Sequence, residues 1–387
     1  MASFERVTVA YVLMGQNTRG ATSASSAPFA RDAASARPIA LWLLTCCALI
    51  AIMVLLGGVT RLRHAGLSIV EWQPLTGVVP PLSAPAWEDA FAQYQRYPEY
   101  QKLNRGMTLD DFKSIFWLEY LHRLWGRLIG IAFLVPCFYF ALRGRIGRAL
   151  IPKLAMLFAL GGLQGALGWY MVKSGLVDRP DVSQYRLSAH LSLAALIYGY
   201  MLWVALSLLR PRIAAQGSRS FSRAGLGVLC LVFATLVSGG FVAGLDAGFA
   251  YNTFPLMQGQ WIPDGLWLMQ PFYRNLFENL ITVQFMHRVL ALASLLAVGL
   301  LWLAARRSAL PARARRACHW LLAAAALQIT LGISTLLLVV PLPLALAHQV
   351  GALLLLTMVI WTLHETHGPP LRSRSASPAL LPGSSGS

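Results

Sequence analysis

Long apolar stretches separated by shorter polar links dominate the hydrophobic pattern of this 387-residue chain. Each stretch has about 20 residues, the length with which an α-helix crosses a lipid bilayer. The pattern predicts eight transmembrane helices, at residues 38–59, 118–142, 150–172, 188–209, 224–245, 280–305, 316–338 and 342–363. The expected fold class is therefore an all-α polytopic membrane protein.

Composition and the placement of charge support this interpretation. Hydrophobic residues make up 57% of the chain and charged residues only 12%, which is unusual for a soluble domain. The net charge of +17 would suit a nucleic-acid-binding protein, but basic residues concentrate in the links after the second, fourth and sixth spans, where acids are absent. This positive-inside pattern predicts that both termini lie on the cytoplasmic or matrix side, with no nucleic-acid partner.

Similar motifs recur in the two halves of the chain in the same order. Leu163-Gln164-Gly165 in the third span matches Leu327-Gln328-Ile329 in the seventh, and Ala189-His190 in the fourth matches Ala347-His348 in the eighth. The first and fifth spans both end near a Gly-Gly pair. We therefore predict two tandem, pseudo-symmetric four-helix bundles. Because each contains an even number of spans, both have the same orientation in the membrane.

The predicted domains follow from this repeat. An N-terminal unit covers 38–212 and includes a large outer loop, 60–117, whose Trp, Tyr and Pro content favours a folded cap at the membrane interface. A C-terminal unit covers 213–367. The Ala/Ser-rich segment 1–37 and the Pro/Ser-rich tail 368–387 are expected to be disordered, although the composition of 1–37 also loosely resembles an organelle transit peptide.

A histidine lies near the outer end of the second and the fourth span of each unit. These residues are His122 and His190 in the N-terminal unit and His287 and His348 in the C-terminal unit. Histidine inside an apolar span is costly and is usually a ligand or a proton relay. A neighbouring carbonyl could satisfy one such residue, but four at matched positions favour paired imidazole ligands of haem iron on facing helices. Zinc fits less well, because carboxylate or cysteine co-ligands are missing nearby.

The cysteines and the other motifs argue against several other cofactors. All five cysteines lie in or beside spans, so no disulfide is expected in the outer loops. The chain has no CxxC pair for zinc or an iron–sulfur cluster and no GxGxxG nucleotide fingerprint. A redox reaction would therefore need an external electron donor, such as a ferredoxin system or quinol.

Cationic and amide side chains accompany the histidines. Four arginines could neutralise haem propionates, although snorkelling to the interface explains them equally well. They are Arg61, Arg123, Arg127 and Arg288. The mid-span amides Gln164 and Gln328 either line a cavity or bond across helices.

A carboxylate distinguishes the two units. Glu119 precedes His122 by one helical turn, whereas Gln284 occupies the matching position before His287. A buried carboxylate should be neutral, paired or catalytic. We hypothesise that Glu119 handles protons during oxygen activation or stabilises positive charge at the reacting carbon. The alternative is a hydrogen bond that orients His122.

Several motifs, from the end of the first span to the start of the second, resemble the haem A synthase family. They are Gly58-Val59-Thr60-Arg61-Leu62, Gly66-Leu67-Ser68, Glu71-Trp72-Gln73-Pro74-Leu75-Thr76-Gly77, Pro98-Glu99-Tyr100 and Glu119-Tyr120-Leu121-His122-Arg123-Leu124-Trp125-Gly126-Arg127. The resemblance extends from the first span to the eighth. Without a cysteine pair in the outer loop, the chain is similar to the alphaproteobacterial and mitochondrial branch of that family.

The resemblance implies a reaction and roles for the polar residues. Members oxidise the C8 methyl of haem O to the formyl of haem A, which cytochrome oxidases need, by successive oxygenations through a hydroxymethyl group and a geminal diol. By this resemblance His287 and His348 hold haem B as cofactor, and His122 and His190 bind the substrate haem. Glu119 becomes the acidic residue at the reacting centre.

The resemblance also implies partners and a location. Expected partners are haem O, oxygen or water as oxygen source, an external electron donor, haem O synthase and membrane lipid, and small residues in the spans leave a homo-oligomer open. The expected location is the bacterial inner membrane, or alternatively the mitochondrial inner membrane, with the haem sites in its outer half. A two-haem electron-transfer cytochrome and a haem transporter are the competing functions.

Overall fold

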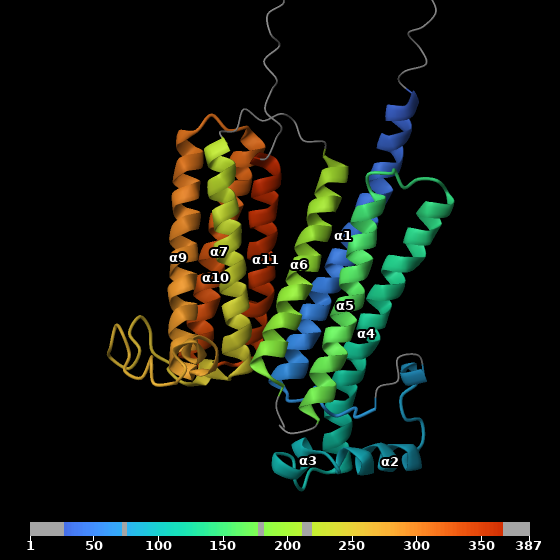
Figure 1. Cartoon of the computed structure of the whole chain (residues 1–387), viewed down its shortest axis with the longest axis vertical. Coiled ribbons are helices and arrows are strands. Elements are labelled where there is room, and N and C mark those ends of the chain that lie inside the picture. Colours follow the sequence, from blue (N-terminus) through green and yellow to red (C-terminus); the bar gives the residue numbers. More distant parts are fainter. Residues whose placement is uncertain (1–26, 72–75, 177–181, 211–218, 367–387) are drawn as a thin grey trace, which may run out of the picture.

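The computed structural model describes residues 27–71, 76–176, 182–210 and 219–366 (Figure 1). Within these ranges the chain forms α-helices and short 3-10 helices and no β-strand. Eight of the helices described are long and apolar enough to cross a membrane. The predicted all-α membrane fold is thus confirmed. Segments 1–26 and 368–387, which were expected to be disordered, lie outside the described residues.

The eight membrane-crossing helices agree closely with the apolar pattern. They are α1 (Ala27–Leu62), α4 (Leu109–Leu142), α5 (Ile151–Gly175), α6 (Gln184–Leu209), α7 (Arg219–Gly244), α9 (Leu280–Arg307), α10 (Ala312–Leu337) and α11 (Leu342–Thr366). Five of them begin before their predicted stretch. Helices α6, α7 and α10 do so by about one turn, whereas α1 extends well into the segment assigned to disorder and α4 well into the outer loop. The early start of α4 has a local cause, because Thr108 forms a capping box with Asp111.

Helices α1, α6, α7 and α11 form the centre of the bundle, and the other four pack on its outside (Figure 1). α4 packs on α1 and α5 on α6, while α9 packs on α7 and α10 on α11. Helices α7, α9, α10 and α11 therefore stand together at the left of Figure 1, and α1, α4, α5 and α6 at the right. The two predicted units, 38–212 and 213–367, and their pseudo-symmetry stay predictions.

The outer helices differ between the two groups. α9 packs closely on α10, which closes the ring of α7, α9, α10 and α11. Helices α4 and α5 have no comparable contact with each other. The N-terminal group is thus held together through its central helices, and its outer pair is not joined along its length.

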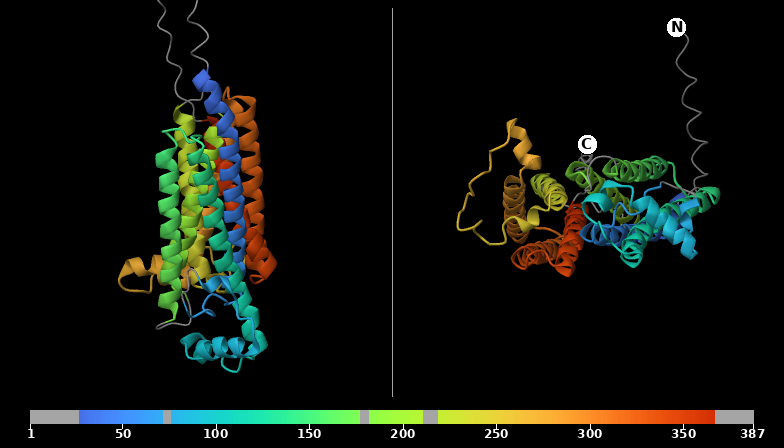
Figure 2. Two further views of the ribbon diagram at one scale, coloured as in Figure 1. Left: turned by 90° about the vertical axis from the view of Figure 1, so that its right-hand side faces the viewer. Right: turned by 90° about the horizontal axis from the view of Figure 1, so that it is seen from below.

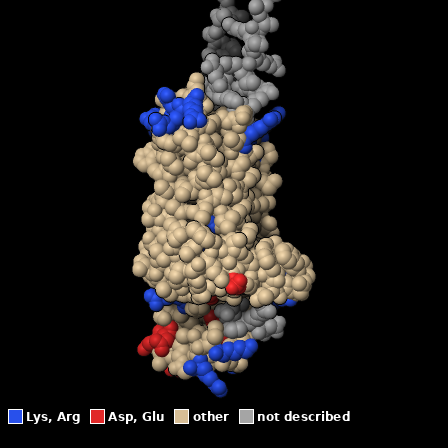
Figure 3. All heavy atoms as spheres, turned by 90° about the vertical axis from the view of Figure 1, so that its left-hand side faces the viewer, with Lys and Arg blue, Asp and Glu red and all other residues tan. Residues whose placement is uncertain are grey.

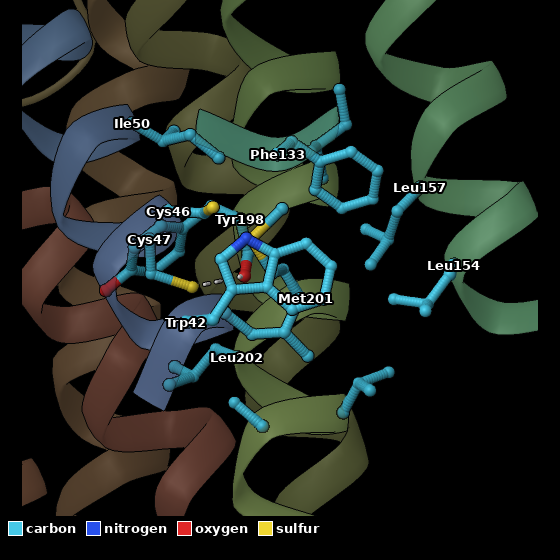
Figure 4. Close-up of a cluster of buried hydrophobic side chains, with 14 of the residues drawn as sticks. Trp42, Cys46, Cys47, Ile50, Phe133, Leu154, Leu157, Tyr198, Met201 and Leu202 are labelled. Carbon is cyan, nitrogen blue, oxygen red and sulfur yellow. Dashed lines mark hydrogen bonds between the residues drawn. The ribbon is translucent and has the colours of Figure 1, made fainter. Parts of the chain in front are cut away.

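Two apolar cores lie within the bundle, and the first extends into the C-terminal group through Leu353, Leu356 and Ile360 of α11. In the N-terminal group, side chains of α1, α4, α5 and α6 interlock around Trp42 (Figure 4). The indole N–H of Trp42 donates to the carbonyl oxygen of Ala132 at 2.8 Å, and the thiol of Cys47 faces the carbonyl oxygen of Tyr198 at 3.9 Å. The second core joins α7, α9, α10 and α11 around Val298 and Leu321.

The outer loop of the N-terminal unit forms a small helical cap beyond the ends of the spans (Figure 2, left). It contains η1 (Thr76–Val78), α2 (Ala84–Tyr94) and α3 (Pro98–Lys102). Tyr94 and Phe112 stack in its aromatic core, with ring centroids 5.2 Å apart. Burial raises the pKa of the Tyr94 hydroxyl, which accepts a hydrogen bond from Asn104 at 2.7 Å. The described part of the outer loop is therefore packed, and its place at the membrane interface stays a prediction.

The corresponding link of the C-terminal half is shorter and lies beside the bundle. It contains η2 (Ala247–Phe249), η3 (Phe272–Arg274) and α8 (Asn275–Glu278), and it reaches outward in the view from below (Figure 2, right).

Charged residues are distributed differently at the two ends of the molecule. On the face shown in Figure 3, Lys and Arg without Asp or Glu gather at the upper end, and acidic residues appear only toward the lower end.

Candidate functional site

All four predicted histidine ligands occur at one kind of helix contact. Each half-buried imidazole packs against a glycine on the neighbouring helix, and a Cβ at that glycine would lie 2.8–3.3 Å from the ring. The pairs are Gly57 with His122, Gly168 with His190, Gly239 with His287 and Gly332 with His348. Only glycine lets the backbones come this close, so the glycines fix where each ring stands.

The second glycine of each Gly-Gly pair contacts the opposite unit. A Cβ at Gly58 would lie 2.7 Å from Oε1 of Gln349, which follows His348 on α11. A Cβ at Gly240 would lie 2.9 Å from the backbone Cα of Ser188, near His190 on α6. Each pair therefore supports a histidine of its own unit and a histidine-bearing helix of the other unit.

Two hydrogen bonds reinforce these cross-unit contacts. The side-chain amide of Gln349 donates to the carbonyl oxygen of Val54 on α1 at 2.7 Å. The hydroxyl of Ser188 donates to the carbonyl oxygen of Val237 on α7 at 2.9 Å. Because these bonds lie next to the glycine contacts, a shift at one histidine site would disturb the helix that carries the other.

The two mid-span glutamines bond across helices, as one of the two sequence interpretations expected. The amide of Gln164 donates to the backbone carbonyl of His190 at 3.1 Å, and that of Gln328 to the carbonyl of His348 at 3.0 Å. Gln328 also lines a cavity, so in the C-terminal unit both interpretations hold. These bonds fix the position of each histidine backbone relative to the neighbouring helix that carries the glutamine.

His287 and His348 face a cavity of about 290 Å³ inside the C-terminal helices. Their ring centroids lie 6.5 Å apart, with the ring planes at 89°. The hydroxyl of Ser238 donates to the carbonyl oxygen of Thr235 at 2.7 Å and lies 2.8 Å from Nδ1 of His287. Ser238 can therefore accept a hydrogen bond from the Nδ1–H of His287, which leaves Nε2 of His287 free as a metal ligand.

The cavity is also lined by charged groups, including one from the N-terminal unit. Arg61, at the end of α1, pairs with Asp246 at 2.6 Å, and both side chains line the cavity. Arg288 donates to the carbonyl oxygens of Tyr251 and Thr253, each at 2.8 Å. Two of the four arginines predicted to face propionates, Arg61 and Arg288, thus lie around the same cavity.

The C-terminal cavity fits a haem with two histidine ligands. The two imidazoles line one cavity with ring centroids 6.5 Å apart, so both could bind one metal ion. Among the described residues, Nε of Arg288 and Oε1 of Gln328 are buried without a hydrogen-bond partner. Polar atoms of this kind usually await a ligand or water. No cluster of three or more His, Cys, Asp or Glu side chains occurs in the described part of the chain, so each site offers a pair of imidazoles.

Glu119 lies at the contact between α4 and the outer loop. Its side chain is almost fully buried, and one carboxylate oxygen accepts from the Ser68 hydroxyl at 2.7 Å and from the backbone N–H of Ile69 at 2.9 Å. The other oxygen accepts from Nη2 of Arg123 at 2.6 Å and from its Nε at 3.0 Å. Arg123 in turn donates to the carbonyl oxygens of Ile69 and Glu71. The pair therefore clamps the loop onto the helix that carries His122.

Gln284 and Arg288 form the matching clamp in the C-terminal half. The amide of Gln284 donates to the carbonyl oxygen of Tyr251 at 3.1 Å, and Arg288 donates to that carbonyl as well. A neutral glutamine suffices at this position because it is a donor to a carbonyl, whereas Glu119 is an acceptor from a hydroxyl and an N–H. The difference between the two units thus has a structural component, which the sequence alone did not reveal.

Comparison with known proteins gives the context for this site. Residues 40–360 match the family model COX15-CtaA, described as cytochrome oxidase assembly protein. The chain belongs to this family. A heme A synthase of Nitrosospira multiformis is 56% identical over 332 residues, which is 85% of this chain and 93% of the relative. The heme A synthase of Rhodospirillum centenum is 50% identical over 92% of this chain and 96% of its own. Heme A synthase COX15 of Bos taurus is 47% identical, over 87% and 84%.

This membership confirms the family expected from the motifs, and the structure adds residues that the motifs did not single out. Ser238, Asp246 and Gln349 support or line the histidine sites, yet each stands alone in the sequence without a motif. The glycines beside the rings were visible as repeated motifs, but their partners depend on which helices meet. Arg127, the fourth of the predicted propionate partners, is half-buried on α4.

Proposed function

We propose that this chain catalyses the haem A synthase reaction, the oxidation of the C8 methyl of haem O to the formyl group of haem A for cytochrome oxidase. The observation that carries the proposal is the set of four matched glycine–histidine contacts, two in each helix group, in a chain of the family whose relatives are named heme A synthase. Two histidine pairs give one haem site for a cofactor and one for a substrate.

The C-terminal site is proposed to hold the cofactor, haem B. His287 and His348 would hold its iron, and Arg61 and Arg288 would bind its propionates, because all four side chains line one cavity. Haem B bound there supplies the redox capacity for the oxidation. The surrounding residues orient it: Ser238 sets the tautomer of His287, and Gln328 fixes the backbone at His348.

The N-terminal site is proposed to bind the substrate haem through His122 and His190. Arg123 and Arg127 remain candidates for its propionates, although Arg123 already pairs with Glu119. We place Glu119 at the reacting centre as the residue that moves protons or stabilises developing positive charge. Its contacts with Ser68 and Ile69 hold the outer loop over this site, which excludes water from the reaction.

The carbon undergoes two successive two-electron oxidations, first to hydroxymethyl and then to a geminal diol, which loses water to give the formyl group. Oxygen or water supplies the oxygen atom, and a ferredoxin system or quinol serves as external electron donor. Haem O synthase would hand over the poorly soluble substrate. The proposed setting is the bacterial inner membrane, with both termini on the cytoplasmic side and the haem sites in the outer half.

Co-expression with a haem O synthase, followed by chromatography and mass spectrometry of the extracted haems, tests the proposal. We expect haem A or its hydroxymethyl precursor with the wild-type chain under aerobic conditions with a working reductant supply. The variants His122→Ala and His348→Ala should abolish product, the first with haem B still bound. Finding only haem B and unmodified haem O with the wild-type chain would support a two-haem electron-transfer cytochrome instead.

A further inference from the structure

The two histidine sites have walls of different size. In the C-terminal unit, the helix face that carries His287 continues with Ala291 and Leu295 on α9, and the facing helix α10 presents Ala325 and Ile329. These four side chains all line the cavity. Because α9 packs on α10, the cavity is closed on this side.

At the matching positions of the N-terminal unit all four residues are glycine. Gly126 and Gly130 follow His122 at intervals of four on α4, so the three share one helix face. On α5, Gly161 and Gly165 share the face of Gly168, the residue that contacts His190.

Three of these glycines border open space. A Cβ added at Gly130, Gly161 or Gly165 would meet no heavy atom within 4 Å. At Gly126 it would meet only the end of the flexible Met53 side chain, at 3.3 Å. Together with the missing contact between α4 and α5, these positions make a seam that begins at the histidine pair and opens at the outside of the bundle. Ordinary helix packing would fill such a seam with side chains.

We infer that this seam receives the isoprenoid chain of haem O, and that its glycines select a haem with such a chain over haem B. The inference rests on the proposed function and deepens it. Haem O differs from haem B by a long apolar chain on the macrocycle, which needs a channel leading away from the iron toward lipid. The seam provides that channel next to His122 and His190. In the C-terminal unit Leu295, Ala325 and Ile329 stand at the matching positions and α9 packs on α10, which suits a haem without the chain.

The test transfers the C-terminal side chains to the N-terminal seam. The variant Gly130→Leu/Gly161→Ala/Gly165→Ile is purified after co-expression with a haem O synthase, and bound haem B and haem O are quantified per chain by extraction and chromatography. We expect unchanged haem B and about a tenfold lower ratio of haem O to haem B, the change that ~1.4 kcal/mol produces. The control Gly299→Ile adds a side chain to α9 where nothing lies within 4 Å, and should change neither haem.

Wild-type haem O content in the triple variant would overturn the inference. Each substitution is also made singly, and loss of haem B from all three single variants would equally overturn it, because the glycines would then serve the folding of the whole chain. Bound haem O is read independently of turnover. A wild-type chain that binds haem O without oxidising it would therefore refute the proposed reaction and leave the binding ratio as the test of the seam.

Discussion

The contact between Gly332 and His348 gives the sharpest test of how the cofactor site is built. A Cβ at Gly332 would lie 2.8 Å from Cε1 of the ring, 3.3 Å from Nδ1 and 3.5 Å from Nε2. Since carbon atoms are best separated by about 3.5–4.0 Å, Gly332→Ala would push the imidazole away by roughly 1 Å. The ring cannot follow freely, because Gln328 holds the backbone carbonyl of His348 at 3.0 Å.

This displacement exceeds the tolerance of about 0.5 Å within which a ligand site must be held. Inserting a methyl group into packed surroundings typically costs about 1–3 kcal/mol. If that cost falls on the haem-bound state, haem B should bind about 5- to 150-fold more weakly. The assay is the rate and extent of haem B transfer from the purified variant to apomyoglobin, followed in the Soret band.

Two further variants make the result specific. Gly168→Ala places a Cβ 3.0 Å from Cε1 of His190, so it should lower haem O occupancy and leave haem B in place. Gly299→Ala, on the same helix as His287 but with nothing within 4 Å, should behave as the wild type. A Gly332→Ala protein with wild-type haem B content, spectrum and transfer rate would refute the idea that this glycine positions the ligand.

Four other substitutions probe the contacts around the sites. Glu119→Gln removes the counter-charge of Arg123, and breaking a buried pair of this kind typically costs about 3–5 kcal/mol. Thermal denaturation should show lower stability, and limited proteolysis should show an exposed outer loop. A protected loop together with lost haem A would assign the carboxylate to the reaction alone. Arg61→Gln should weaken haem B retention. Asp246→Asn should weaken it less, because the ion pair of Asp246 with Arg61 is partly exposed and screened by solvent. Equal effects of the two variants in the transfer assay would contradict a propionate role for Arg61. Gly240→Ala sets a Cβ against the Ser188 backbone, a clash that no rotamer change can relieve. Both haems should therefore be lost, and thermal stability should fall. Selective loss of one haem would show that the two units do not depend on this contact.

Glu119 illustrates how the structure changes the weight of a sequence argument. A carboxylate present in one unit and replaced by glutamine in the other indicated chemistry, and that role stays a prediction. The structure shows that two of its hydrogen bonds come from the outer loop and two from Arg123, which itself donates to the loop carbonyls of Ile69 and Glu71. A variant at this position therefore has to be measured for loop order as well as for haem A.

The sequence by itself determined the spans, the four histidines and the family. Apolar length decides whether a segment crosses the membrane, and this property belongs to each segment alone. The positions of His122 and His348 near the ends of such segments follow from the same pattern. The predicted boundaries of α9 and α11 accordingly begin where the structure places them, at Leu280 and Leu342.

Only the tertiary structure decided what each of these residues touches. Helical periodicity gives the face of a residue but not the helix that packs against this face. The glycines beside the rings, the cross-unit contact of Gly240, and the contribution of Arg61 to the C-terminal cavity all depend on which helices meet. The seam between α4 and α5 is open because these two helices do not pack closely on each other. A sequence pattern indicates which face of a helix is buried, but it does not give the distance to the neighbouring helix.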